Sequence, residues 1–144
     1  MRRPAALFAG AVAVAVLAAL AAGVAVIGSP AEIRGMRLDR QKIADLRRIA
    51  GAIDAHLNRT GALPPELKAL ETPDQPAPFR LADPETGEPY DYAGTGPRSY
   101  RLCAIFSHPT GTDDKDGDRS RTPGFWRHGA GRHCFAIEVA KPKH

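Results

Sequence analysis

The residues with the greatest potential for chemistry gather in the last third of the chain. They are two cysteines, three histidines and four aspartates: Cys103, Cys134, His108, His128, His133, Asp113, Asp114, Asp116 and Asp118. Paired thiols can form a disulfide, thiolates and imidazoles can bind zinc, and carboxylates can bind calcium. The spacing of these residues and the elements that carry them decide among the three possibilities.

Asp114, Asp116 and Asp118 have the 1-3-5 spacing of a calcium-binding loop. An EF-hand loop needs glycine at its sixth position and a bidentate glutamate at its twelfth, where this chain has Arg119 and Phe125. The sequence therefore excludes an EF-hand. Two interpretations are left for this segment, a solvated acidic loop and a looser calcium-binding loop.

The histidines and cysteines lack the short paired spacing of zinc sites, so we predict no metal centre and no cofactor. His133 and Cys134 are adjacent on a predicted strand, where neighbouring side chains point to opposite faces. The chain also has no C-x-x-C pair, nucleophile elbow, phosphate-binding loop or dinucleotide-binding motif. We therefore predict no catalytic residues; a small membrane-anchored enzyme that depends on His108, His128 or His133 is an alternative.

Cys103 and Cys134 are predicted to form a disulfide. Each lies within a predicted strand, and the two strands can neighbour each other across the polar loop 107–131. A bridge that closes about 32 residues stabilises a domain by roughly 3–4 kcal/mol, in the description that assigns its effect to the entropy of the unfolded chain. The alternative is two buried free thiols, which is the expectation for a domain that faces the cytosol.

The chain also contains an uncharged apolar segment at residues 5–27. As a helix with a rise of about 1.5 Å per residue, it would be roughly 34 Å long and would exceed a hydrocarbon core of about 30 Å. We predict an uncleaved transmembrane helix that follows a cytoplasmic head at residues 1–4. A cleaved secretory signal is the alternative, although such signals have a shorter apolar stretch and a clear cleavage site.

Basic residues flank the apolar segment on both sides, so the positive-inside rule does not decide its orientation. A very short basic head is typical of a signal anchor, and the two cysteines suit an oxidising space. We therefore predict a single-pass protein with its N-terminus in the cytoplasm and its C-terminal domain outside.

Residues 28–35 are predicted as a linker, and an amphipathic helix is predicted from about residue 36 to about residue 58. Its apolar side chains recur at helical spacing: Ile43, Leu46, Ile49, Ala50, Ile53 and Leu57. Basic side chains, Lys42 among them, lie largely off this stripe and are predicted to be solvated. Aspartates balance these charges, so we predict no nucleic-acid partner. Gly61 is the predicted stop of the helix.

All aromatic residues outside the apolar segment follow residue 78, so the core of the domain is expected to be C-terminal. A short helix at 65–70 and a turn at 83–89 are expected before the sheet. About three or four antiparallel strands are predicted, three of them at residues 90–92, 99–106 and 133–139. The fold class is therefore α+β: over residues 36–144 the amphipathic helix packs on one face of a small antiparallel sheet.

Two motifs in this domain resemble those of type IV pilins and type II secretion pseudopilins, most of all the major pseudopilin. The first is GALPPELKAL at 61–70, in which the matching residues are Gly61, Pro64, Leu67 and Leu70. The second is DPETGEPYDY at 83–92, in which the matching residues are Asp83, Pro84, Gly87, Pro89, Tyr90 and Tyr92. The resemblance implies a membrane helix, an amphipathic helix and a sheet in that order. It also implies a bacterial inner membrane as the location, with the C-terminal domain in the periplasm. The prepilin peptidase motif is absent, because no acidic residue precedes Glu32.

The combined prediction is a non-catalytic scaffold or interaction protein with a pseudopilin-like extracytoplasmic domain, related to secretion or to pili. Its expected partners are the lipid bilayer, through residues 5–27, and a protein, either another protein or a second copy of this chain. No small-molecule substrate is evident in the sequence. The alternative function is a membrane-anchored ligand- or calcium-binding module that uses the loop 107–133.

Overall fold

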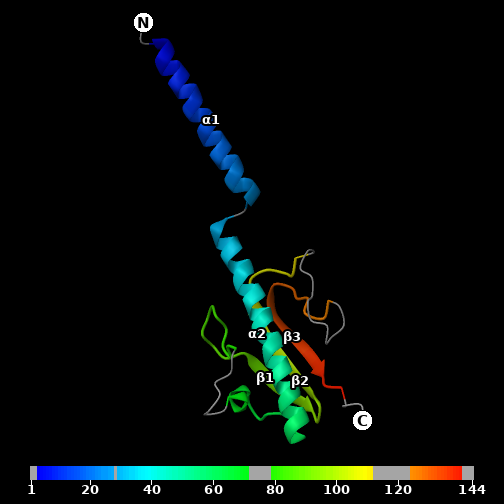
Figure 1. Ribbon diagram of the computed structural model, residues 1–144. Helices are drawn as coiled ribbons and strands as arrows, with labels where there is room; N and C mark the ends of the chain where they lie inside the picture. Colours follow the sequence, from blue (N-terminus) through cyan, green and yellow to red (C-terminus); the bar gives the residue numbers. More distant parts are fainter. Residues whose placement is uncertain (1–2, 28, 72–78, 112–123, 141–144) are drawn as a thin grey trace. The chain divides into compact units, whose positions relative to one another are not determined.

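The computed structural model describes residues 3–27, 29–71, 79–111 and 124–140. The chain divides into two compact units, residues 1–34 and residues 35–144. The first unit contains helix α1 (Arg3–Ile27), which is drawn in blue in Figure 1. Helix α2 (Pro30–Thr60) starts at the end of the first unit and provides the long helix of the second.

Helix α1 is the one described helix that is long and apolar enough to span a membrane. Its apolar window, Ala6–Val24, has a mean hydropathy of 2.5, and 0% of the window is buried inside the protein. Large side chains such as Leu7, Phe8 and Leu17 are exposed by 65–76%. A helix with this surface requires apolar surroundings, which a bilayer supplies. This agrees with the predicted apolar span, and a secretory signal would share these properties.

Helix α2 begins at Pro30, whereas the sequence predicted a linker up to residue 35. The Glu32 N–H donates to Ser29 Oγ (3.2 Å) and the Ser29 N–H donates to Glu32 Oε2 (2.8 Å), which is a capping box. Pro30 occupies the first helical position, where its missing N–H costs no hydrogen bond. The prediction placed Pro30 within the linker. It missed that Ser-x-x-Glu around the same proline starts the next helix.

Helix α2 ends as predicted. Gly61 has a φ of +80°, and its N–H donates to the Leu57 carbonyl (2.8 Å). Glycine is favoured in this left-handed conformation after a helix. The predicted apolar stripe is buried, and five of its members are at most 1% exposed: Leu46, Ile49, Ala50, Ile53 and Leu57.

Three strands follow the short 3-10 helix η1 (Leu67–Leu70). They are β1 (Asp91–Gly96), β2 (Ser99–Phe106) and β3 (Gly131–Glu138). They form an antiparallel sheet in the order β1-β2-β3. The first strand is longer than predicted, because the small residues 93–96 continue the pairing with β2 that begins at Asp91.

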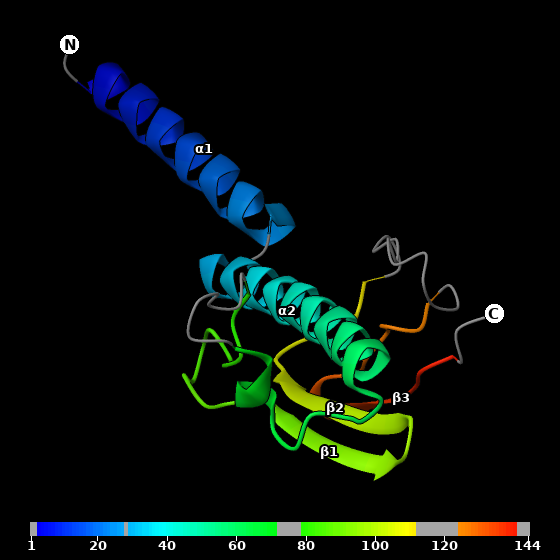
Figure 2. The same cartoon turned by 60° about the horizontal axis from the view of Figure 1, so that its bottom comes forward.

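Helix α2 lies across one face of the sheet, as Figures 1 and 2 show. Alternate side chains of β2 and β3 are buried in one core with the stripe of α2: Tyr100, Leu102, Ala104, Phe106, Phe135 and Ile137. The Tyr100 hydroxyl lies 3.2 Å from the Ala50 carbonyl oxygen and 3.0 Å from Asp54 Oδ1, so it also bonds to α2. The predicted α+β arrangement of a helix on a small antiparallel sheet is therefore confirmed.

Candidate functional site

The predicted disulfide is present. Cys103 of β2 and Cys134 of β3 are bonded, with a Cα–Cα distance of 4.0 Å. They form a directly opposed pair in the register of the two strands. Their neighbours Leu102 and Phe135 face α2, so the disulfide lies on the opposite face of the sheet. The alternative of two free thiols is contradicted.

Lys42 is the main departure from the sequence prediction. It was expected on a solvated face, yet the residue is only 1% exposed. Its Nζ donates to Glu85 Oε2 (2.7 Å) and to the Ile105 carbonyl oxygen (2.8 Å). The same nitrogen lies 3.2 Å from Asp83 Oδ2. One ammonium group therefore ties α2 both to the loop 81–90 and to the end of β2.

The Lys42 ammonium is held in its charged form. Burial lowers its pKa, but the hydrogen bonds and charges of Glu85 and Asp83 outweigh burial and raise the pKa above its ordinary value of 10.5. Because the pKa is higher in the folded state, the stabilising contribution is complete below pH 10.5 and is lost only as the pH rises through the folded value.

The loop that receives Lys42 contains the predicted turn at 83–89. Asp83 Oδ1 accepts a hydrogen bond from the Glu85 N–H (2.8 Å), and the Asp83 carbonyl accepts one from the Gly87 N–H (2.8 Å). Gly87 has a φ of +76°, which favours glycine. Asp83 thus has two roles: one carboxylate oxygen organises the turn while the other faces Lys42.

A second buried carboxylate joins α2 to the chain just after β2. Asp39, which is 5% exposed, accepts hydrogen bonds from the backbone N–H groups of Ser107 (3.0 Å) and His108 (2.8 Å). The His108 Nδ1 atom lies 3.4 Å from Asp39 Oδ2. We refer to the following four residues as the charge clamp: Asp39, Lys42, Asp83 and Glu85.

Gly35 leaves the space that the His108 imidazole occupies. A Cβ at position 35 would lie 2.6 Å from His108 Cε1, whereas a Cβ at Gly51 of the same helix would meet nothing within 4 Å. We expect Gly51→Ala to raise the free energy of unfolding by about 1 kcal/mol through helix propensity. Gly35→Ala should gain less stability than Gly51→Ala, because the His108 imidazole, which is 34% exposed, must move aside.

Urea unfolding of the full chain in detergent micelles measures both glycine variants. The chain's single tryptophan, Trp126, is 2% exposed and supplies the fluorescence signal. Equal gains in the free energy of unfolding of the two variants would show that the His108 imidazole does not press on Gly35.

Asp45 and Tyr90 form a further buried polar pair, 3% and 5% exposed. The two side chains interact with each other, although Asp45 Oδ2 and the Tyr90 hydroxyl do not meet the geometry of a regular hydrogen bond. Burial raises the pKa of the Asp45 carboxyl above 3.8, although the charges of Arg48 and Arg80 partly oppose this. Burial and the charges of Asp45 and Asp83 raise the pKa of the Tyr90 hydroxyl.

Asp45→Asn should increase stability at neutral pH. Folding favours the protonated carboxyl, so this contribution is present below pH 3.8 and is lost as the pH rises through the folded pKa. At neutral pH the wild type therefore carries the cost of a buried carboxylate, which the amide avoids. Urea unfolding at neutral pH and below pH 3.8 should show the gain shrinking as the pH falls. The exposed Glu88→Gln is the control, and a less stable Asp45→Asn at neutral pH would contradict this account.

The three histidines considered as metal ligands contact different neighbours. The His128 ring stacks on Phe106 with a centroid distance of 3.6 Å, and the His133 ring lies 6.4 Å from that of His128. His108 and His128 line a small cavity of about 90 Å³ together with Asp39. Within the described part of the chain, no group of three or more His, Cys, Asp or Glu side chains is placed to hold a metal ion.

The acidic run at 113–118 lies outside the described residues, so both interpretations of it stay predictions. The chain after it is described from residue 124. There the buried Trp126 ring contacts Phe125 and Phe135, with centroid distances of 5.1 and 4.8 Å. The Arg47 guanidinium lies 5.9 Å from the centroid of the indole. Trp126 thus closes one edge of the core.

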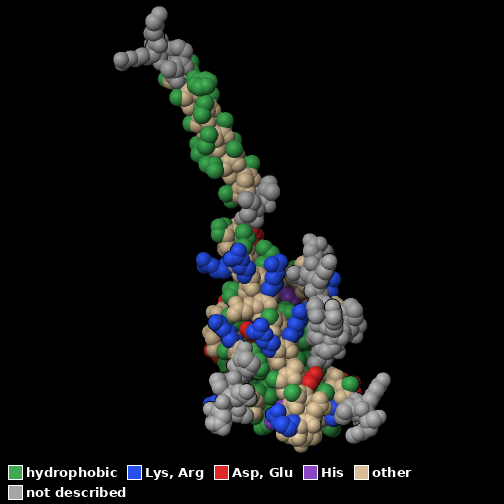
Figure 3. All heavy atoms as spheres, viewed as in Figure 1, with side chains coloured by type: hydrophobic (Ala, Val, Ile, Leu, Met, Phe, Trp, Pro, Cys, Tyr) green, Lys and Arg blue, Asp and Glu red, His purple; other side chains and the backbone are tan. Residues whose placement is uncertain are grey.

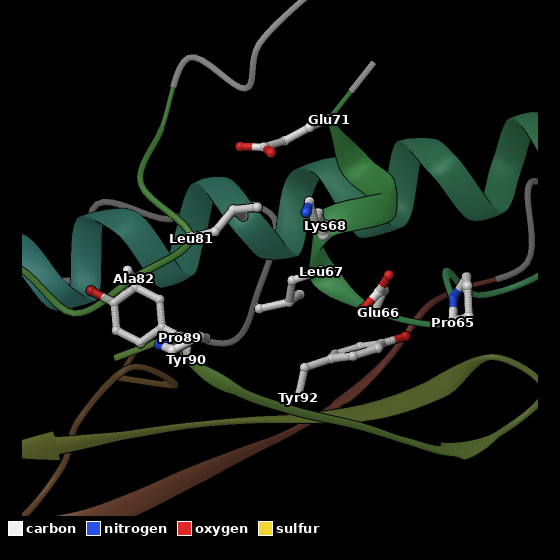
Figure 4. A pocket seen from close by; sticks show the side chains of 10 residues that line it. All are labelled: Pro65, Glu66, Leu67, Lys68, Glu71, Leu81, Ala82, Pro89, Tyr90 and Tyr92. Carbon is white, nitrogen blue, oxygen red and sulfur yellow. The ribbon is translucent and has the colours of Figure 1, made fainter. Parts of the chain in front are cut away.

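A larger open pocket, of about 460 Å³, is lined by η1, the loop 81–90 and the start of β1. In Figure 4 the rings of Tyr90 and Tyr92 and the side chain of Leu67 border this space. The Tyr92 hydroxyl donates to the Pro64 carbonyl (2.9 Å). Burial raises the pKa of this hydroxyl. Tyr92 therefore supports the chain just before η1, and Tyr90 lines the same pocket.

The sequence did contain a signal for the charge clamp. Lys42 precedes Leu46 by four residues and Ile49 by seven, so helical spacing alone places it on the buried face. Its charge favoured exposure to solvent in the prediction, and its partners on the loop 81–90 are distant in sequence.

Comparisons of the chain with protein-family models, with curated proteins and with solved structures find no match.

Proposed function

We propose that this chain is a single-pass membrane protein whose extracytoplasmic domain acts as a non-catalytic scaffold. The observation that carries the proposal is the Cys103–Cys134 disulfide in a chain that also has an exposed apolar helix. Disulfides persist in oxidising spaces such as the periplasm and are rare in the cytosol. The apolar helix supplies the membrane attachment.

The pseudopilin-like part of the proposal rests on the places that the two motifs occupy. Gly61 follows the last turn of α2, and η1 brings Leu67 into the core. The turn at 83–89 leads directly into β1. These positions support a pseudopilin-like domain, and with it a bacterial inner-membrane location and a role connected to secretion or to pili.

A scaffold must hold its surfaces in a fixed geometry, and α2 has two kinds of contact that do this. Its apolar stripe packs in the core, which resists separation of the helix from the sheet. The hydrogen bonds of Lys42 and Asp39 are directional and resist rotation and sliding of the helix. A protein partner or a second copy would therefore meet a rigid surface.

Intact-mass spectrometry under non-reducing conditions tests this function on protein extracted from membranes. We expect a chain that retains residues 5–27 and whose mass is lower than that of the reduced chain by two hydrogens. A membrane-extracted chain that starts after residue 27 would contradict the anchor, and two free thiols would contradict the oxidising compartment. Turnover of a substrate by the purified full chain would contradict the scaffold.

A further inference from the structure

A pocket of about 460 Å³ lies between η1, the loop 81–90 and the start of β1, all within the second unit of the chain. This volume is within the range of about 300–1,000 Å³ that is typical of ligand-binding pockets. Four of the residues that line it carry rings: Pro65, Pro89, Tyr90 and Tyr92. In Figure 4 the side chain of Leu67 lies between the two tyrosine rings. We call this space the tyrosine pocket.

The apolar surface of the tyrosine pocket is formed before any ligand binds. The Tyr92 hydroxyl donates to the Pro64 carbonyl (2.9 Å), which fixes one of the rings. Tyr90 and Leu67 are 5% and 7% exposed and belong to the core, which holds them in place. A preformed surface binds a ligand at a lower entropic cost than a surface that must first be ordered.

The rings favour proline as the residue of a ligand that contacts them. Proline-rich segments dock in grooves that are lined by aromatic rings. Such segments largely adopt a polyproline II helix before they bind, so they lose little conformational entropy on binding. A flexible apolar peptide lacks this advantage, because its backbone and side chains must be ordered.

The rim of the tyrosine pocket is acidic, in contrast to the chain as a whole. The chain has a net charge of +4, and Figure 3 shows Lys and Arg side chains, in blue, gathered along α2. The rim has the carboxylates of Glu66 and Glu71 and the single ammonium group of Lys68. Among the described residues, neither carboxylate has a hydrogen-bond or ion-pair partner, and the nearby Arg80 acts on the buried carboxyl of Asp45. A cationic side chain of a ligand therefore complements the rim.

We propose that the tyrosine pocket binds a proline-rich segment of a partner protein that carries an arginine. The rings contact the prolines, and the guanidinium bonds to the rim carboxylates, to which it can donate two parallel hydrogen bonds. In Figure 4 the Glu66 side chain and the Tyr92 ring lie on the same side of the pocket, so one arginine can contact both. This inference rests on the proposed function for the class of partner, a protein, and not for the anchor or the compartment.

The test uses the full chain in nanodiscs of phosphatidylcholine, whose neutral headgroups do not attract a basic peptide. The probe is the fluorescein-labelled peptide Ala-Pro-Pro-Arg-Pro-Pro-Ala, and fluorescence anisotropy measures its binding. We expect saturable binding with a dissociation constant below about 1 mM. A peptide with alanine in place of the four prolines should bind about tenfold more weakly, because it must be ordered on binding.

The charge of the rim is tested by combining Glu66→Gln with Glu71→Gln. Both side chains are exposed, so the fold is kept, and the arginine peptide should bind about three- to tenfold more weakly. A peptide with glutamine in place of arginine should bind the wild type and this variant equally. The matched control combines Glu88→Gln with Glu138→Gln, which are exposed and do not line the pocket, and it should bind as the wild type does.

The ring of Tyr92 is tested by comparing Tyr92→Phe with Tyr92→Leu. Both variants lose the hydrogen bond to Pro64, and only phenylalanine keeps the ring, so the leucine variant should bind about tenfold more weakly than the phenylalanine variant.

The proposal is overturned if the wild type shows no saturable binding, or if the glutamine control loses as much affinity as the rim variant. If the peptide binds only after residues 72–78 are replaced by glycine and serine, the occupant is the chain's own segment, and the proposal is likewise overturned. Intact-mass spectrometry of the same sample separates this proposal from the proposed function. An anchored, disulfide-bonded chain that binds no peptide contradicts the pocket alone, whereas a cleaved or reduced chain contradicts the proposed function whatever it binds.

Discussion

Removing the Cys103–Cys134 disulfide should lower the free energy of unfolding by about 3–4 kcal/mol. The bridge joins residues that are 31 apart in sequence, and opening it returns that loop's freedom to the unfolded chain. The variant Cys103→Ala combined with Cys134→Ala removes the bond without leaving a reactive thiol. Urea unfolding of the full chain in micelles, followed by Trp126 fluorescence, measures the change.

Dithiothreitol provides the control for this prediction. It should shift the unfolding of the wild type towards that of the alanine variant and should not change the variant itself. If the alanine variant unfolds at the wild-type urea concentration, the disulfide does not stabilise the domain. The sheet would then depend on its other contacts, including those with α2.

Lys42→Met should be the second large loss, about 3 kcal/mol. Removing one partner of a buried ion pair costs about 3–5 kcal/mol, because the remaining charge is left uncompensated. The lower end applies here, since the Glu85 side chain is 43% exposed and can be solvated, whereas that of Asp83 is only 9% exposed. Methionine keeps the length of the apolar stem, so the loss reports the ammonium group. The same urea titration measures it.

Lys68→Met is the matched control, because Lys68 is exposed on η1 and its replacement should change stability by less than about 0.5 kcal/mol. A double-mutant cycle with Asp83→Asn sharpens the prediction. Loss of both partners should cost less than the sum of the two single losses, because the one carboxylate left without Lys42, that of Glu85, is 43% exposed and can be solvated. Strict additivity, or a Lys42→Met variant as stable as Lys68→Met, would contradict the charge clamp.

The features that sequence patterns predicted well are those set by local periodicity. The apolar stripe of α2 repeats at helical spacing, and β2 alternates apolar and polar residues, so each element and its buried face could be assigned. The pairing of Cys103 with Cys134 followed from two adjacent strands. Gly61 could be placed after the helix because few other residues adopt its left-handed backbone.

The features that the sequence did not reveal depend on contacts between distant residues. Lys42 was predicted to be solvated because an unpaired charge is costly to bury, and its partners Asp83 and Glu85 became visible only when the loop 81–90 was in place. The extension of β1 through small residues likewise depends on pairing with β2 rather than on local preference. Tertiary context therefore decided both cases.

The measurement that tests the central claim most directly is the location of the domain in bacterial cells. Alkaline phosphatase and green fluorescent protein are fused in turn to the C-terminus after His144. Alkaline phosphatase needs an oxidising space to fold, whereas green fluorescent protein reports the cytosol. An extracytoplasmic, disulfide-bonded domain predicts an active phosphatase fusion and a dark fluorescent fusion. A bright fluorescent fusion with an inactive phosphatase would place the domain in the cytosol and contradict the proposed function.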